Sequence, residues 1–220
     1  MEKKHPKVAL IIPAYNEAER IGAVLDEAVK SPVINEIIVV DDGSTDTTAE
    51  VAGSHEGVTV ISRNLNGGKG AALKMGIDST DAEILVLIDA DLIGLKVKHI
   101  EDLVEPLLLE EDLEMTRGKF TKGRTATNIS QAVVPNISGQ RAFKRKFLTD
   151  MPDFTNSGYG VEVAFTRQIR RKQTEVKEVI LPNITHVMKE EKMGLRKGLL
   201  ERFKMYRDIF YLLIKPKRKG

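Results

Sequence analysis

The 220-residue chain contains no cysteine and no tryptophan, and aromatic side chains make up only 5% of it. Without cysteine the protein has no disulfide scaffold, no thiolate nucleophile and no thiolate ligands for zinc or an iron–sulfur cluster. Any metal ion must therefore be bound through oxygen or imidazole. Such ligands favour Mg²⁺ or Mn²⁺.

The sequence also lacks a long apolar run. The first apolar segment is interrupted at Pro13, and no segment approaches the ~20 apolar residues that a membrane-spanning helix needs. The N-terminus does not have the pattern of a cleavable secretory signal. We therefore expect a cytoplasmic protein that does not span a membrane.

The chain has little excess charge, with a formal net charge of +2. Its basic residues gather after Lys192, next to an apolar stripe with helical spacing (Leu195, Leu199, Phe203, Tyr206, Phe210 and Leu213). This predicts a basic helix and tail over 195–220, which either packs onto the domain or lies on anionic lipid at the inner face of the membrane. A homodimer is a further option. No aromatic-basic platform or recognition motif indicates a nucleic-acid partner.

The first half of the chain alternates strands with helices. Apolar, β-branched runs predict strands over 8–13, 36–40, 58–62 and 83–88, and helical patterns predict helices over 16–30, 45–52 and 69–78. This order is typical of an α/β fold with a mostly parallel sheet and helices on both faces.

The second half is less regular. It predicts helices over 99–109 and 157–171, strands over 114–120 and 176–181, and a polar loop over 122–128. No repeat or low-complexity linker divides the chain, so we expect a single domain over 1–220.

Four polar clusters follow the four predicted strands of the first half, at 14–17, 41–46, 63–70 and 89–91. Each cluster alone could be a turn or a helix cap. Ligands bind at the carboxyl ends of strands in parallel sheets, so clusters at successive strand ends should meet at one rim. The sequence therefore predicts a binding site there.

The acidic clusters suit a nucleotide and a metal ion. Alternate residues of an extended segment point the same way, so Asp89 and Asp91 can face one divalent cation, or one can hold a ribose. Asp42 can accept hydrogen bonds from a base or ribose. Arg63 and Lys69, with the N-terminus of the helix after them, can hold an anion.

These motifs together resemble family 2 glycosyltransferases. The resemblance rests on PAYNE at 13–17, VVDDGSTD at 39–46, the Gly-Lys-Gly segment within 64–72 and DAD at 89–91. It implies the Rossmann-like GT-A fold, a UDP- or GDP-linked sugar as donor, and Mg²⁺ or Mn²⁺ bound through Asp91. It also implies a donor site that comprises Pro13, Ala14, Tyr15, Glu17, Asp42, Arg63, Lys69, Asp89 and Ala90.

The second half is similar to the glucosyl-3-phosphoglycerate synthase branch, through 138–141, 158–162 and 185–186. This implies that Gly139 and Gln140 line the sugar pocket, that Glu162 binds sugar or acts as a base, and that His186 is a metal ligand. Asp153 is a rival general base. His186 could instead be a structural histidine, and Glu162 a solvated residue near a helix N-terminus.

We therefore expect a metal-dependent glycosyltransferase with a glycerate-type or lipid-linked acceptor. In this interpretation 1–98 binds the nucleotide sugar, 99–194 carries the acceptor site, and 195–220 is the basic tail. One alternative is an inactive nucleotide-sugar-binding subunit, which the retained Asp89 and Asp91 argue against. Another is a sugar-phosphate nucleotidyltransferase, whose Gly-rich, Arg-containing N-terminal loop is missing where PAYNE stands.

Overall fold

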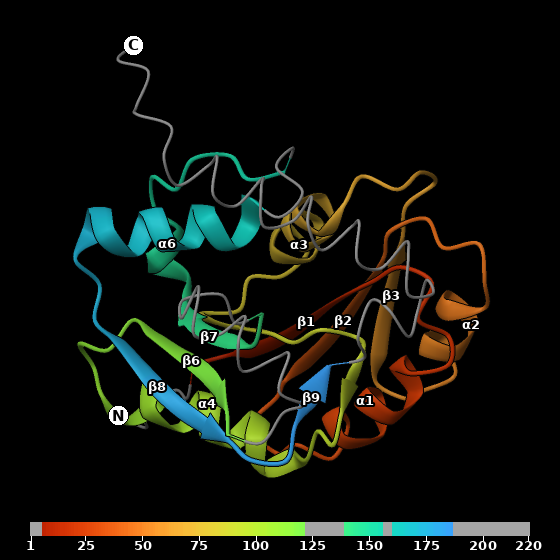
Figure 1. Ribbon diagram of the computed structural model, residues 1–220, viewed down its shortest axis with the longest axis horizontal. Coiled ribbons are helices and arrows are strands. Elements are labelled where there is room, and N and C mark those ends of the chain that lie inside the picture. Colours follow the sequence, from red (N-terminus) through yellow and green to blue (C-terminus); the bar gives the residue numbers. More distant parts are fainter. Residues whose placement is uncertain (1–5, 122–138, 156–159, 187–220) are drawn as a thin grey trace.

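A computed structural model describes the protein over residues 6–121, 139–155 and 160–186. Its centre is a seven-stranded sheet of order β3-β2-β1-β4-β7-β6-β8, with a separate ribbon of β5 and β9 (Figure 1). The strands are β1 (Val8–Ala14), β2 (Glu36–Asp41), β3 (Val58–Ser62), β4 (Ile84–Leu87), β5 (Leu92–Ile93), β6 (Met115–Phe120), β7 (Arg141–Lys144), β8 (Val176–Leu181) and β9 (Thr185–His186). The helices are α1 (Ile21–Ala28), α2 (Thr48–Gly53), α3 (Lys69–Asp78), α4 (Val97–Leu109), η1 (Arg145–Leu148) and α6 (Gly160–Lys172).

The first four long strands form the predicted parallel part of the sheet. β1 pairs in parallel with β2 on one side and with β4 on the other, and β3 extends the sheet beyond β2. β1 is buried along nearly its whole length, as its apolar composition requires of a central strand. The connections reverse direction between β1 and β4, and in such sheets this reversal opens the crevice in which ligands bind.

The second half completes the same sheet. β7 lies antiparallel between β4 and β6, and β8 pairs in parallel with β6. The ribbon is antiparallel and pairs Leu92 with His186 and Ile93 with Thr185. Strands from both halves therefore form one continuous sheet over the described residues.

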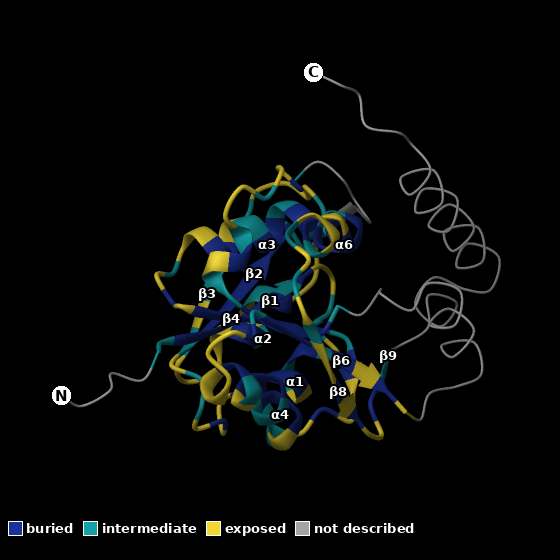
Figure 2. Ribbon diagram, turned by 90° about the vertical axis from the view of Figure 1, so that its left-hand side faces the viewer, coloured by how far each residue is buried: buried dark blue, intermediate teal, exposed yellow. Residues whose placement is uncertain are grey.

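Helices cover both faces of the sheet, as predicted. In Figure 2, α3 and α6 lie on one side, and α1 and α4 lie on the other. The α3 and α6 side is packed with a group that includes Ile11, Leu73, Phe143 and Phe165. The opposite side packs the alternate strand residues, such as Leu10 and Ile12, against α1 and α4. This alternation between faces is the period-two pattern of a strand.

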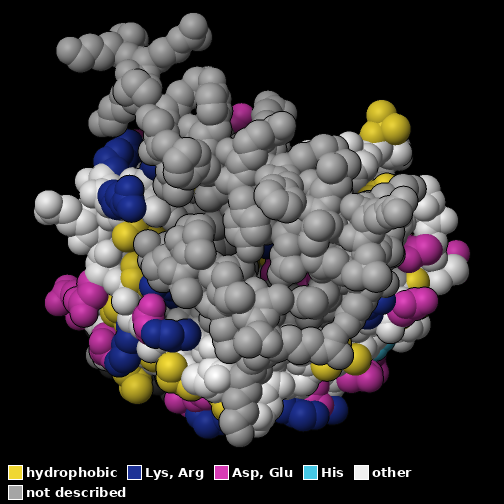
Figure 3. All heavy atoms as spheres, in the orientation of Figure 1, with side chains coloured by type: hydrophobic (Ala, Val, Ile, Leu, Met, Phe, Trp, Pro, Cys, Tyr) yellow, Lys and Arg dark blue, Asp and Glu magenta, His cyan; other side chains and the backbone are white. Residues whose placement is uncertain are grey.

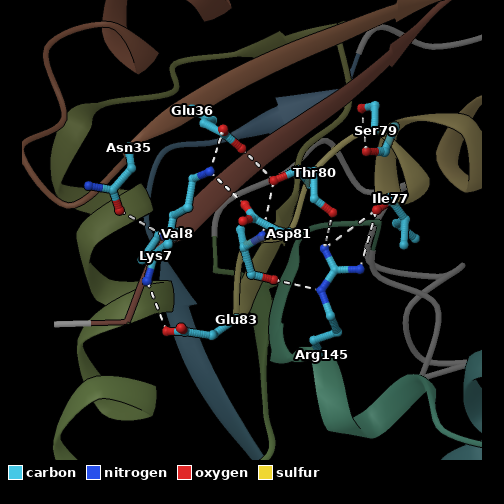
Figure 4. A network of polar contacts seen from close by, with 12 residues as sticks. Lys7, Val8, Asn35, Glu36, Ile77, Ser79, Thr80, Asp81, Glu83 and Arg145 are labelled. Carbon is cyan, nitrogen blue, oxygen red and sulfur yellow. Dashed lines mark hydrogen bonds and ion pairs between the residues drawn. The ribbon is translucent and has the colours of Figure 1, made fainter. Parts of the chain in front are cut away.

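A polar network fixes the amino end of the sheet (Figure 4). Lys7 Nζ lies 2.7 Å from Glu36 Oε1 and 2.6 Å from Asp81 Oδ1. The guanidinium of Arg145 donates to the backbone carbonyls of Ala82, Thr80 and Ile77 at the α3–β4 connection. The network joins β1, β2 and η1 at the amino end of the parallel strands.

Some expected elements differ. The first helix begins at Ile21 rather than Asn16, because Asn16 has a left-handed backbone with φ of 55°. β7 and the β5–β9 ribbon were not predicted. The predicted loop over 122–128 and the terminal helix and tail over 195–220 lie outside the described residues.

None of the described helices is long and apolar enough to cross a membrane. On the described part of the face in Figure 3, Lys and Arg side chains are interspersed with Asp and Glu side chains. This mixture fits the small formal net charge.

Candidate functional site

The loops that follow β1 and β2 are hydrogen-bonded to each other. The backbone N–H of Asn16 donates to Ser44 Oγ at 2.9 Å, and the N–H of Thr45 donates to Asn16 Oδ1 at 2.8 Å. The N–H of Glu17 donates to Thr48 Oγ1 at 2.8 Å. These bonds hold the 14–17 and 41–46 clusters together at the carboxyl end of the sheet, as the sequence predicts.

The donor-site candidates of the 13–17 segment differ in exposure. Pro13 and Ala14 are the last but one and last residues of β1, and Ala14 is buried. Tyr15 is 45% exposed, so its ring is accessible at this rim. The Glu17 carboxylate lies 3.5 Å from Arg20 Nη1.

Asp42 anchors the loop that leads into α3. Asp42 is only 3% exposed, and its carboxylate forms an ion pair with Arg63. The same carboxylate accepts hydrogen bonds from the N–H groups of Gly67, at 3.0 Å, and Gly68, at 2.7 Å. Asp42 therefore has a positioning role that the sequence interpretation, which assigned it to the nucleoside, did not include.

Lys69 is the first residue of α3 and lies between two acidic side chains. Its Nζ is 2.7 Å from Asp89 Oδ1 and 3.2 Å from Glu162 Oε1. Burial by itself would lower the pKa of Lys69, but the two carboxylates outweigh it and raise the pKa above its ordinary value. Lys69 is therefore a fixed cation that joins the two halves of the chain.

Asp89 is held on its other side by the segment before β7. Gln140 Nε2 donates to Asp89 Oδ2 at 2.9 Å. Gly139 lies so close that an added Cβ would be 2.3 Å from the same oxygen. The predicted donor residues Gly139, Gln140, Lys69 and Asp89 thus come together, with the buried Ala90 following Asp89.

Glu162 lies in the first turn of α6 and is 8% exposed. The buried guanidinium of Arg141 stacks 4.5 Å from the ring centroid of Phe165, one turn further along α6. Burial lowers the pKa of Arg141 to about 10, with Arg117 also lowering it and Glu162 and Asp89 raising it. Arg141 stays charged at neutral pH and adds a cation to this cluster. Sequence reasoning missed its role, although it directly follows Gln140 in the motif over 138–141.

The β5–β9 ribbon carries His186 to the acidic triplet. His186 pairs with Leu92, the residue after Asp91, so one predicted metal ligand lies at the end of β9 and the other directly before the residue of β5 with which it pairs. A carboxylate and an imidazole are suitable donors for Mn²⁺. Within the described residues no group of three acidic or histidine side chains could hold a metal. A metal at this position would therefore complete its coordination with substrate oxygens or water.

Asp153 lies elsewhere. Its carboxylate accepts hydrogen bonds from the Thr155 N–H at 2.9 Å and the Thr155 hydroxyl at 3.0 Å, and these bonds lower its pKa. It lines a surface pocket of about 480 Å³ together with Lys74 and Arg145, and Asp153 is the only candidate site residue among the lining residues. This environment favours Glu162 over Asp153 as the acidic residue of the site.

Comparison with known proteins gives consistent relatives. The glucosyl-3-phosphoglycerate synthase of Mycobacterium tuberculosis is 28% identical over 194 residues, which cover 71% of this chain and 58% of that enzyme. The synthase of Petrotoga mobilis is 25% identical over 206 residues, which cover 78% of this chain and 63% of that enzyme. Human dolichyl-phosphate beta-glucosyltransferase is 37% identical over 100 residues, 39% of this chain and 31% of that protein. The chain thus spans less than two thirds of the length of these curated relatives.

Solved structures show the same similarity. One crystal structure of the M. tuberculosis synthase, in complex with Mn²⁺, UDP and glucosyl-3-phosphoglycerate, superposes on this chain with a TM-score of 0.78. The superposition covers 97% of this chain and 82% of that chain, and the two sequences are 28% identical. A complex with Mg²⁺ and UDP has the same TM-score at 27% identity and covers 81% of that chain. The fold is the predicted GT-A arrangement. Because residues 9–203 match the sequence model of glycosyl transferase family 2, the chain belongs to that family.

Proposed function

We propose that the protein is a metal-dependent glucosyltransferase that uses UDP-glucose and transfers glucose to a small phosphorylated hydroxy acid such as phosphoglycerate. The observation that supports the proposal best is the Lys69 ammonium lying between Asp89 and Glu162, one from each half of the chain. The structural neighbours add chemical detail, because one crystal structure of the M. tuberculosis synthase is a complex with Mn²⁺, UDP-glucose and phosphoglyceric acid.

The donor would lie across the carboxyl ends of β1, β2 and β4. The exposed Tyr15 and the loop that Asp42 anchors would contact the nucleoside, and the N-terminus of α3 would face the diphosphate. Mg²⁺ or Mn²⁺ bound through Asp91 and His186 would neutralise charge that develops on the departing diphosphate. Lys69 would orient Asp89 and Glu162 through its two ion pairs.

In the transfer, the acceptor hydroxyl oxygen forms a bond to the anomeric carbon of glucose while the bond from that carbon to UDP breaks. The hydroxyl proton must leave at the same stage. Glu162 is the acidic group that would hold a sugar hydroxyl or take that proton, because it lies at the cluster and Asp153 does not.

The test is a transfer assay with the full chain, Mn²⁺, and UDP-glucose or GDP-glucose as donor. The acceptor panel contains 3-phosphoglycerate, glycerol 3-phosphate and a polyprenyl phosphate in detergent. We expect a glucosylated product from UDP-glucose and 3-phosphoglycerate. A product only with polyprenyl phosphate would replace this acceptor by a lipid-linked one and would support membrane contact through 195–220.

The variant Asp91→Ala separates the enzyme from a binding protein. It should bind UDP with the same affinity in chelator and in Mn²⁺, since the metal-dependent part of binding is lost. If the unmodified chain bound UDP equally well under both conditions, the assignment of Asp91 would be wrong. If it bound UDP-glucose with Mn²⁺ but produced neither a transfer product nor free glucose, the non-catalytic alternative would hold.

A further inference from the structure

His99 is a buried histidine at the start of α4, outside the cluster around Lys69. It is only 7% exposed. Its Nδ1 accepts a hydrogen bond from the backbone N–H of Lys96 at 3.0 Å, and the backbone N–H of His99 donates to the Lys96 carbonyl at 2.9 Å. The imidazole also forms a hydrogen bond with the backbone of Pro182. One side chain thus connects the start of α4 with the segment that follows β8.

Proline determines the direction of that last bond. Pro182 has no backbone N–H, so its carbonyl accepts and the imidazole must donate. Since Nδ1 already accepts from Lys96, the proton is on Nε2. His99 is therefore a neutral imidazole in a single tautomer, with both ring nitrogens used. Its lowered pKa, which results chiefly from burial, agrees with this state.

The bond to Pro182 acts on the short connection that leads to the proposed metal ligand. β8 ends at Leu181 and β9 begins at Thr185, so the connection is 182–184, and Ile184 within it is fully buried. His186 is two residues past this buried side chain. A displacement of Pro182 would therefore be passed on to His186.

A second contact fixes the same connection from the other strand of the ribbon. Gly94, just after β5, has a φ of +83°, and an added Cβ there would be 2.4 Å from the carbonyl oxygen of Asn183. Asn183 itself has a left-handed backbone with φ of 60°. The chain after Asp91 and the chain before His186 are therefore in close backbone contact beside the ribbon.

The start of α4 is itself anchored to the body of the domain. The backbone N–H of Val97 donates to Glu27 Oε2 at 3.1 Å, and Lys96 Nζ lies 3.5 Å from Glu27 Oε1. Glu27 belongs to α1. The contacts thus run from α1 through Lys96 and His99 to Pro182, and from there along the chain to His186.

We infer that His99 is a positioning residue for the metal site. Its hydrogen bond to the Pro182 carbonyl keeps His186 at the ribbon position that pairs with Leu92, next to Asp91 in the chain. The close contact between Gly94 and Asn183 assists it from β5. The inference rests on the proposed function in one respect, namely that His186 and Asp91 bind the metal. It assigns a function to a residue outside the cluster around Lys69, which acts on His186 through the short connection 182–184.

Three substitutions separate the two hydrogen bonds of His99. His99→Asn keeps an acceptor near Nδ1 for Lys96 but cannot reach Pro182. His99→Gln places an N–H near the position of Nε2 and so can keep the bond to Pro182. His99→Phe fills the volume and makes neither bond. His55→Gln is the matched control, because His55 connects α1 and α2 through Asp26 and Val51 and has no contact with the ribbon among its hydrogen bonds.

The measurement is the dissociation constant of Mn²⁺ for the full chain with saturating UDP, by calorimetry, at a temperature where thermal unfolding curves show every variant folded. We expect His99→Phe and His99→Asn to weaken Mn²⁺ binding on the order of tenfold, the range seen when groups that orient metal ligands are removed. His99→Gln should recover most of the affinity, and His55→Gln should match the unmodified chain. A merely structural role would lower the unfolding temperature and leave the Mn²⁺ affinity of the folded protein unchanged.

Gly94→Ala tests the second contact, with Gly57→Ala as control. Gly57 has a similar φ of +79°, but nothing lies within 4 Å of the added methyl group, so it reproduces the backbone strain without the collision. Gly94→Ala should weaken Mn²⁺ binding more than Gly57→Ala does. Equal effects of the two would remove Gly94 from the inference.

His186→Ala distinguishes failure of this inference from failure of the proposed function. If His186→Ala binds Mn²⁺ as tightly as the unmodified chain, the metal assignment itself is wrong. If His186→Ala weakens binding while His99→Phe and His99→Asn do not, the metal site stands and the role of His99 is overturned. A weakened His99→Gln beside an unaffected His99→Asn would also overturn it, because the Mn²⁺ affinity would then depend on the bond to Lys96 and not on the bond to Pro182.

Discussion

The Lys69 ammonium lies 2.7 Å from the Asp89 carboxylate and so connects the first residue of α3 to the segment just after β4. Its second ion pair, to Glu162, joins residues 93 positions apart in the chain. The strand order of the sheet makes this possible, because β4 and β7 are neighbours and α3 and α6 cover the same face. The site is thus a product of the fold rather than of one motif.

Replacing Lys69 by methionine should weaken this site strongly. The change keeps most of the side-chain volume but leaves Asp89 and Glu162 without the cation between them. We expect UDP-glucose binding to fall by about 2 kcal/mol, the scale of a charged hydrogen bond, and the transfer rate to fall with it. Calorimetry and the transfer assay would measure both.

Lys74→Met is the matched control on the same helix. Lys74 pairs with Asp78 at the surface of α3, and such exposed pairs contribute roughly 0–1 kcal/mol to stability. Equal losses of donor binding in Lys69→Met and Lys74→Met would mean that the loss reflects general damage to α3 and not the ion pairs of Lys69.

Much of the fold follows from sequence periodicity. The predicted spans for β3, α3 and β8 agree with the structure, because apolar runs and turn residues mark their ends. The sequence does not indicate β7, because this strand is only four residues long and both of its end residues, Arg141 and Lys144, are charged. Its burial depends on partners β4 and β6, which local sequence does not reveal.

The sequence could predict those site residues whose position depends only on the end of a single strand. Asp42, Lys69 and Asp89 follow apolar strands, so the sequence alone indicates a shared rim. The contacts that cross between the halves could not be inferred in this way. Arg141 stacks on Phe165 and His99 reaches Pro182 only because separate elements pack together, and neither spacing nor composition encodes those pairs.

Gly139→Ala should displace Asp89. The added methyl group would be 2.3 Å from Asp89 Oδ2, which is the oxygen that Gln140 holds. We expect weaker metal-dependent binding of UDP-glucose, while UDP binding in chelator should change little. Gly53→Ala, whose nearest neighbour would be Val60 Cγ2 at 3.9 Å, is the control and should leave both affinities unaltered.

Arg141→Met should destabilise the domain. The change removes a buried cation, so that Lys69 is the main positive charge left beside the carboxylates of Asp89 and Glu162. Loss of one partner from a buried charge cluster costs on the order of 3 kcal/mol of unfolding free energy. Urea denaturation would measure this loss, and Arg141→Lys, which keeps the charge but not the planar stacking on Phe165, should lose less. An equal loss in both variants would assign the effect to stacking alone.

The stability of the domain should fall below neutral pH in a way that depends on His99. Its folded pKa is lowered by burial, an effect that Lys96 reinforces and that Asp102, Glu27 and the Pro182 carbonyl oppose. Above the unfolded pKa of about 6.5 both states are neutral, and His99 adds no pH dependence. As the pH falls below that value, the unfolded chain binds a proton first, so the free energy of unfolding decreases until the folded pKa is reached.

The comparison of His99→Gln with the unmodified chain isolates this effect, since all other titrating groups are shared. Urea denaturation at pH 7.5 and pH 5.5 would give the difference, which should not exceed roughly 1.4 kcal/mol per pH unit. The unmodified chain should lose more stability between the two pH values than His99→Gln does. An identical loss in both proteins would show that His99 takes up its proton equally in the folded and unfolded states.

Asp42→Ala should act on the donor site by two routes, which can be told apart. The carboxylate holds Arg63 and the N–H groups of Gly67 and Gly68, so its removal should loosen the segment before Lys69 as well as any direct contact with the nucleoside. We expect UMP binding without metal to weaken by about 1–3 kcal/mol. A double-mutant cycle with Lys69→Met would measure UDP-glucose binding to both single variants and to the double variant. If Asp42 acts by positioning the loop before Lys69, the two losses of binding free energy should be coupled by at least about 0.5 kcal/mol. Additive losses would instead mean that Asp42 acts on the nucleoside without passing through Lys69.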